Sequence, residues 1–216
     1  MGKDFLDRNL ALEAVRVTEA AALSSSLHMG RGNEKAADQA AVNAMRDFLN
    51  NLAIDGKVVI GEGERDEAPM LYIGEKVGKG GPKVDIALDP LEGTTITALG
   101  GENALSVLAM AQDGGFLHSP DIYMQKIAYR KKYEGLDIDP ESPANEIIQK
   151  FSKFSDMKIE NIVVCILNRP RHQELINKIR KTGARIKLIS DGDVSAVIAT
   201  TFEDSGVDIY GNRGSS

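Results

Sequence analysis

Two short acidic segments contain the residues of this 216-residue chain best suited to chemistry. The first of them, residues 85–95, reads DIALDPLEGTT. We expect a strand to deliver Asp89 at its end, Pro90 to stop further strand pairing, and a turn to bring Glu92 back to the same point. Two carboxylates would then converge at one place.

The residues after this turn predict what the carboxylates could bind. Gly93 lets the backbone approach a ligand closely. Thr94 or Thr95 can cap a following helix, whose N-terminus suits an anionic phosphate. Hard oxygen ligands beside an anion site favour Mg²⁺ or Mn²⁺ that holds a phosphate ester. A solvated acidic turn with a threonine cap is the alternative.

The second acidic segment, residues 61–67, reads GEGERDE and directly follows an expected strand. Its four carboxylates repel one another unless solvent or a cation intervenes, and an exposed acidic loop is the plainer alternative. Its glycines lack the offset of a dinucleotide fingerprint, and residues 78–82 lack the spacing of a P-loop. The segment therefore adds candidate cation ligands and no nucleotide motif.

Two later segments each lie between an expected strand and an expected helix. Arg169 and Arg171, on either side of Pro170, would place two guanidinium groups at a helix start, where a second phosphate could bind. They could equally be surface arginines. In the segment Asp191-Gly192-Asp193, the carboxylates could accept hydrogen bonds from sugar hydroxyls, or could only cap the helix. The three histidines show no zinc-pair spacing, and no serine lies in a nucleophile elbow.

The composition limits the classes of molecule that this chain is expected to bind. With 42% hydrophobic and 27% charged residues the chain is globular, and its net charge of −6 gives little attraction to nucleic acid or anionic membranes. It has no apolar run long enough to cross a bilayer and no signal-peptide core at its start. We therefore expect a cytoplasmic protein that acts on small molecules. The single cysteine, Cys165, lies in an apolar run and is expected to be a small buried hydrophobe.

Hydrophobic spacing indicates the elements that must position these residues. Apolar residues at helical spacing predict two opening helices, with Leu6, Leu10, Ala14, Val17 and Ala21 in the first and Ala37, Ala41, Met45, Phe48 and Leu52 in the second. Between them, Gly30 and Gly32 should end the first helix, and Asn33 should cap the next.

Short β-branched runs predict strands at 57–60 and 84–88. The apolar run 104–110 is short enough for either a helix or a strand, and we favour a strand. Residues 131–143 are expected to form an exposed connection to a helix that ends near Phe154. From Ile162 the pattern predicts a parallel βαβα unit, so we expect one domain over 1–157 and a second over 158–216. A parallel sheet of two strands is not a domain, so either the chain is incomplete or this unit packs on something else. An incomplete chain would expose a sheet edge and apolar helix faces here.

Several segments, in this order, resemble class II fructose-1,6-bisphosphatases, which belong to the lithium-sensitive sugar and inositol phosphatase superfamily. The resemblance covers nearly the whole chain, and the segments that carry it are 61–64, 66–75, 85–94, 119–124, 169–172 and 191–193. It implies a layered α/β fold of the sugar-phosphatase type (αβαβα), with the second sheet domain incomplete. It also implies a homodimer or homotetramer and a role in gluconeogenesis.

The resemblance assigns roles residue by residue. Asp38, Glu62, Asp89 and Glu92 resemble the metal ligands, with Mn²⁺ or Mg²⁺ as the metal, and Thr94 the hydroxyl that positions and deprotonates the attacking water. Asp38, Glu62 and Thr94 are thus the catalytic candidates. The substrate-binding positions would be Glu92, Gly93, Thr94, Tyr123, Arg169, Pro170, Arg171, Asp191, Gly192 and Asp193. The implied reaction is hydrolysis of the 1-phosphate of fructose 1,6-bisphosphate, with sedoheptulose 1,7-bisphosphate as a second candidate.

The chain departs from the family pattern in two places. Glu34 stands where the family has a lysine, which here follows as Lys35. After Tyr210-Gly211 the family continues with a glycine-rich stretch that ends in Ala-Pro-Glu-Gly, whose glutamate is a further ligand, so we expect a chain truncated at its C-terminus. This keeps two other hypotheses open, a catalytically silent sugar-phosphate-binding fragment and an inositol-phosphate phosphatase.

Overall fold

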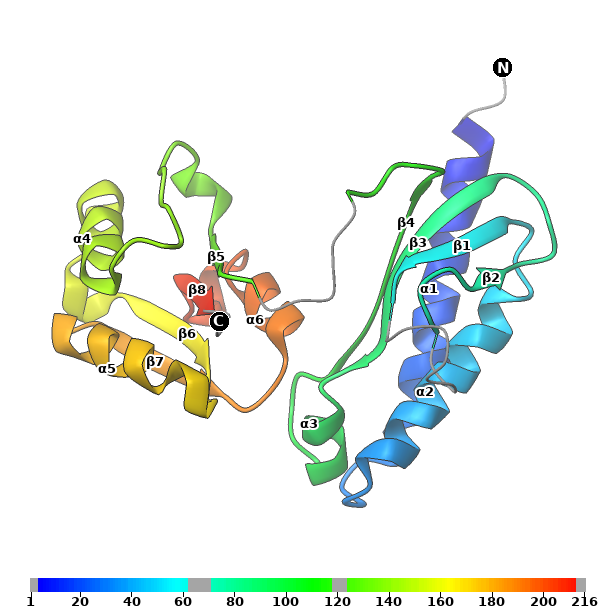
Figure 1. The fold of residues 1–216 in the computed structure, drawn as a ribbon, viewed down its shortest axis with the longest axis horizontal. Coiled ribbons are helices and arrows are strands. Elements are labelled where there is room, and N and C mark those ends of the chain that lie inside the picture. The colour runs from blue at the N-terminus through cyan, green and yellow to red at the C-terminus, as the bar shows by residue number, and fades with distance from the viewer. Residues whose placement is uncertain (1–3, 62–70, 118–123, 213–216) are drawn as a thin grey trace. The chain divides into compact units, whose positions relative to one another are not determined.

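The computed structural model describes residues 4–61, 71–117 and 124–212 (Figure 1). The chain divides into two compact units, Met1–Asp121 and Ile122–Ser216. The first contains α1 (Asp4–Ser26), α2 (Glu34–Leu49), β1 (Asp55–Ile60), β2 (Lys76–Val77), β3 (Lys83–Glu92), α3 (Thr94–Leu99) and β4 (Leu105–Gln112). The second contains β5 (Lys126–Tyr129), α4 (Ala144–Ser155), β6 (Val163–Leu167), α5 (Gln173–Thr182), β7 (Arg185–Ile189), α6 (Asp193–Ala199) and β8 (Ile209–Asn212).

The described part of the first unit is a sheet with strand order β2-β1-β3-β4 and helices α1 and α2 on one face (Figure 1). Strand β1 runs parallel to β3, whereas β2 and β4 pair antiparallel with their neighbours. Alternate residues of β3, Val84, Ile86 and Leu88, join the core beneath the helices. This alternation follows from the period of two in a strand, and it confirms the strand predicted here.

The second helix begins as the sequence predicts. The Asn33 side chain accepts a hydrogen bond from the backbone N–H of Ala36 at 3.0 Å, which satisfies one of the free donors of the first turn. Its buried row consists of Ala37, Ala41, Met45 and Leu49. Phe48, which was expected on the apolar stripe, is 46% exposed. The buried row advances four residues at a time and therefore ends on Leu49.

The second unit contains an αβα sandwich. In its described part the sheet has the order β5-β8-β6-β7, with β6 parallel to β7 and β8. Helices α4 and α5 supply Ile148, Phe151 and Ile176 to the core on one face. On the other face, α6 packs against Cys165 and Tyr210. The predicted parallel βαβα unit, the buried cysteine and the layered α/β class are confirmed.

Three expectations differ from the structure. The units divide at Asp121 and not near residue 158, because β5 and α4 belong to the second core. The connection 131–143 is not fully exposed, since Tyr133, Leu136 and Ile138 are at most 8% exposed. The sheet of the βαβα unit gains β5 and β8 and so extends beyond two strands.

Some apolar surface of the second unit remains open to solvent. Strand β7 lies at the end of the strand order, and its Leu188 is 38% exposed. On α6, Val197 and Ile198 are 38% and 43% exposed. The expected exposed sheet edge and apolar helix residues are thus confirmed. Among the described helices, none has the length and apolar character to cross a bilayer.

Candidate active site

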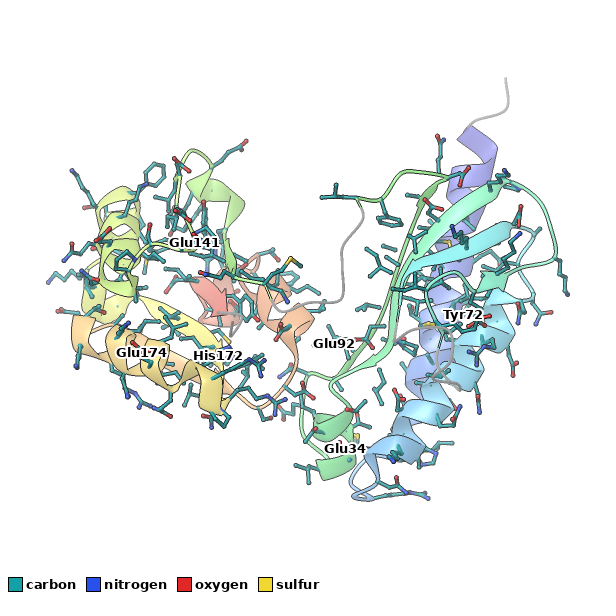
Figure 2. All side chains as sticks on the ribbon, in the orientation of Figure 1. Glu34, Tyr72, Glu92, Glu141, His172 and Glu174 are labelled. Atoms are coloured by element: carbon teal, nitrogen blue, oxygen red, sulfur yellow. The ribbon has the colours of Figure 1, made fainter. Side chains whose placement is uncertain are left out.

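A bulge near the end of β3 brings two predicted ligands to one face of the sheet. Asp89 pairs with Val107 of β4, whereas Glu92 pairs with Leu105, so β3 carries one extra residue between the two pairs. Val107 and Leu105 are two residues apart and point to the same face. Asp89 and Glu92 therefore share a face as well, and Figure 2 shows Glu92 where β3 gives way to α3.

The prediction that Pro90 ends the strand is wrong. Strand β3 continues to Glu92, and Pro90 lies within the bulge, where the missing N–H removes no regular ladder bond. The backbone N–H of Leu91 instead donates to Oδ1 of Asp89 at 3.1 Å. This bond, local to the sequence, fixes the shape of the bulge.

Gly93 lies between the bulge and α3 in a backbone conformation that only glycine adopts without strain. Its φ is +99°, and an added Cβ would lie 3.2 Å from Ile96 and 3.3 Å from Ala104. Gly93 is itself the N-cap of α3, so the prediction that Thr94 or Thr95 caps the helix is wrong. Thr94 is the first helical residue, half-buried, and directly follows the bulge.

The loop before α2 fastens this helix to the same region. The backbone N–H of Gly30 donates to the carbonyl of Thr97 at 2.9 Å, and that of Gly32 donates to Ala98 at 2.8 Å. Both glycines have φ near +70°. The start of α2 is thereby held against α3, and Asp38, on an early turn of α2, is brought to this end of the unit.

Asp38 has the environment of a cation ligand. Its Oδ1 atom is buried and accepts no hydrogen bond within the described part of the chain. Burial raises the pKa of this carboxyl group above its ordinary value. A bound divalent cation would complete the coordination of that oxygen and offset the cost of burying the charge.

Glu92 is only 8% exposed and adds a second buried carboxylate to the region. The donor chemistry of Asp38, Asp89 and Glu92 thus fits Mg²⁺ or Mn²⁺. Within residues 4–61, 71–117 and 124–212, no three acidic, histidine or cysteine side chains lie close enough to form a complete metal site. The fourth predicted ligand, Glu62, lies outside those ranges.

In the second unit, two predicted substrate residues lie together at the ends of adjacent parallel strands. Nη2 of Arg169 lies 3.5 Å from Oδ1 of Asp191. The backbone N–H of Asn168 donates to the carbonyl of Ile189 at 2.7 Å, which joins the segment after β6 to the end of β7. Ligands commonly bind at this end of parallel strands.

His172 is a supporting residue whose role the sequence did not indicate. It is fully buried, and its Nδ1 lies 2.9 Å from the carbonyl oxygen of Leu167. Figure 2 shows it at the end of β6, where α5 begins. The contact fixes the 3₁₀ turn Pro170–His172 against the strand, and this turn carries the exposed Arg171. Its one signal in the sequence is its place in segment 169–172, which carries part of the family resemblance.

The aspartates around Gly192 are not helix caps. Gly192, with φ of +97°, is the N-cap of α6, and Asp193 is the first helical residue. Oδ2 of Asp193 lies 3.4 Å from Nζ of Lys126, a pairing that the sequence did not reveal. The capping interpretation of Asp191 and Asp193 is therefore wrong. Tyr123, the remaining predicted contact, lies outside the described residues.

Comparison with known proteins identifies the family of this chain. The family model for bacterial fructose-1,6-bisphosphatase, glpX-encoded, matches residues 8–216. This chain belongs to that family. Fructose-1,6-bisphosphatase 1 class 2 of Escherichia coli K12 is 49% identical over 209 residues, which cover 96% of this chain and 62% of that protein. The class 2 enzymes of Escherichia coli O6:H1 and Shigella flexneri match to the same extent.

The resemblance drawn from the sequence is confirmed. The chain spans about 62% of the length of the curated relatives that it matches. The roles of the individual site residues are predictions.

Proposed function

We propose that this chain takes part in the metal-dependent hydrolysis of the 1-phosphate of fructose 1,6-bisphosphate, which yields fructose 6-phosphate and phosphate. Sedoheptulose 1,7-bisphosphate is a second candidate substrate. The bulge that turns Asp89 and Glu92 to one face carries this proposal, together with the buried oxygen of Asp38. The names of the relatives, class 2 fructose-1,6-bisphosphatases, supply the substrate.

In this proposal Asp38, Glu62, Asp89 and Glu92 hold Mn²⁺ or Mg²⁺. The bound metal supplies charge neutralisation at the phosphate and lowers the pKa of a bound water. Thr94 positions that water with its hydroxyl and assists removal of its proton. Gly93, which has no side chain, lets the backbone approach the phosphate closely beside the bulge.

The second unit would bind the part of the substrate that does not react. Arg169 and Arg171 hold the distal phosphate, for which planar guanidinium groups are suited. Asp191 keeps Arg169 at the strand ends. Asp193 accepts hydrogen bonds from sugar hydroxyls, and the hydroxyl of Tyr123 donates a hydrogen bond to them or accepts one from them. Binding energy from this end orients the reacting phosphate. We also infer a cytoplasmic location and a homodimer or homotetramer.

Phosphate release measured with Mn²⁺ and fructose 1,6-bisphosphate tests the proposal. Asp89→Asn keeps an oxygen that can accept the Leu91 N–H but loses the charge, so we expect release to fall roughly 100-fold or more. Asp47→Ala, which removes an exposed carboxylate of α2, is the matched control and should leave release unchanged.

The outcomes separate the candidate functions. Turnover that depends on Asp89 supports the phosphatase. Saturable binding of the bisphosphate without turnover, reduced by Arg169→Gln, would instead support a silent sugar-phosphate-binding protein. Release from an inositol monophosphate in preference to the sugar bisphosphate would overturn the substrate assignment.

A further inference from the structure

Helix α1 has apolar residues on two opposite sides. On the inner side, Val17 and Ala21 are fully buried beneath the first unit's core. On the outer side, Leu12 and Leu23 are 66% and 70% exposed, and Leu27, directly after the end of the helix, is 68% exposed. A helix that covers only one sheet is normally polar on its outer side. The outer leucines therefore indicate a surface that another protein covers.

The outer stripe is defined here as Leu12, Arg16, Glu19 and Leu23. At 3.6 residues per turn these four fall within about 60° of one another around the helix axis. Nη1 of Arg16 lies 2.8 Å from Oε2 of Glu19, and both side chains are largely exposed. A pair of opposite charges thus occupies the middle of the stripe, and a leucine lies at each end.

The order of these residues is self-complementary. Leu12 and Leu23 are equally distant from the midpoint between Val17 and Thr18, and so are Arg16 and Glu19. Consider a second identical helix that runs antiparallel and is centred on the same midpoint. Leu12 of each helix then meets Leu23 of the other, and Arg16 of each helix meets Glu19 of the other. A parallel neighbour would set like charges side by side. This is the pattern of an isologous, two-fold interface.

We propose that α1 pairs with α1 of a second copy of this chain, antiparallel and two-fold symmetric, through the outer stripe. Leu12 packs on Leu23 of the second copy, and Arg16 pairs with Glu19 of the second copy. Centred on this midpoint, the two helices overlap over residues 9–26 of α1, which gives a seam of about 27 Å, long enough to form the centre of a dimer interface. This inference assigns a surface to the homo-oligomer inferred above, and it uses none of the residues of the candidate active site.

Sedimentation velocity over a range of protein concentrations tests the apolar part of the seam. The unaltered chain should associate, and Leu23→Lys or Leu12→Lys should raise the dissociation constant at least tenfold. Leu117→Lys is the matched control, because Leu117 is 90% exposed and lies outside α1. An unaltered chain that stays monomeric at about 100 µM would overturn the proposal, as would unchanged association of Leu23→Lys.

A charge series tests the antiparallel register. Arg16→Glu alone places glutamate against glutamate across the seam, and Glu19→Arg alone places arginine against arginine, so both variants should associate more weakly. An equimolar mixture of the two variants should form heterodimers, since both cross-seam pairs are then of opposite charge. The pair within each helix stays like-charged in this mixture, so recovery cannot come from helix stability. A mixture that associates no better than either variant would overturn the register.

Discussion

Asp89 and Glu92 point to the same face of β3 although they are three residues apart. In a regular strand, residues three apart lie on opposite faces. The single extra residue of the bulge cancels this alternation, and Leu91, within the bulge, still packs into the core. The bulge thus allows one strand to bury an apolar residue and to present two carboxylates on its other face.

Gly93→Ala should disrupt this arrangement. The added methyl group would contact Ile96 and Ala104 in a left-handed backbone conformation, so we expect the free energy of unfolding to fall by about 2 kcal/mol or more. Gly80→Ala is the control: Gly80 has φ of +94° and nothing within 4 Å of an added Cβ. Denaturant titration of both variants separates the effect of the methyl contact with Ile96 and Ala104 from the effect of backbone strain. Equal losses of unfolding free energy in the two variants would show that the contact adds nothing.

Asp38→Asn should stabilise the metal-free chain at neutral pH. Burial raises the pKa of Asp38, so the folded chain holds this proton to a higher pH than the unfolded chain does. The charged carboxylate is therefore a penalty on folding that appears as pH rises above roughly 4 and is complete above the folded-state pKa. The amide carries no charge and avoids the penalty, while it removes a proposed metal ligand.

Melting temperatures with EDTA at several pH values would measure this effect. The variant should melt higher than the unaltered chain at pH 8, and the gap should close as pH falls to about 4. Adding Mn²⁺ should raise the melting temperature of the unaltered chain more than that of the variant. Asp47→Asn, exposed on the same helix, provides the baseline. A lower melting temperature of Asp38→Asn at pH 8 in EDTA would contradict the prediction.

The elements that follow from local chemistry could be predicted from the sequence. Asn33 caps α2, and Val84, Ile86 and Leu88 alternate into the core, because capping and strand periodicity depend on neighbours in sequence. The bulge could not be predicted, because it is defined by the register of β3 against β4. Pro90 alone suggested an end to the strand.

Contacts between residues that are distant in the sequence could not be predicted either. Residues 131–143 look polar, but their apolar members pack against α4, which only the folded second unit reveals. The fixing of the arginine turn by His172 likewise depends on a carbonyl of β6. For the site, residue types and the family resemblance indicated the candidate residues. Their local geometry could not be predicted, because it depends on contacts between residues distant in the sequence.

The ion pair of Arg46 and Glu75 should contribute measurably to stability. Nε of Arg46 lies 2.7 Å from Oε1 of Glu75, Nη2 lies 3.1 Å from Oε2, and the two side chains are only 25% and 11% exposed. Arg46→Met leaves a mostly buried carboxylate without this partner, so we expect a loss of about 2 kcal/mol, between the values for exposed and buried pairs.

A variant of an exposed ion pair shows whether the loss of unfolding free energy arises from the burial of Arg46 and Glu75. Lys178 and Glu174 form an exposed pair at 2.6 Å on α5, and Lys178→Met should cost at most about 0.5 kcal/mol. Urea titration of both variants gives the comparison. If the two losses were equal, the partial burial of Arg46 and Glu75 would add nothing.

Cys165 should report unfolding of the second unit alone. It is the chain's one cysteine, is 1% exposed in the core against α6, and has a pKa raised by burial. Both effects slow its reaction with a thiol reagent, because the thiolate is the reacting form. In increasing urea, its labelling should follow loss of the second unit's structure.

Two cavity variants test this independence. Leu71→Ala, which leaves a cavity in the first unit's core, should lower the urea midpoint of that unit and leave the labelling of Cys165 unchanged. Ile166→Ala, in the core of the second unit, should accelerate the labelling. Equal acceleration by both variants would show that the two units unfold as one.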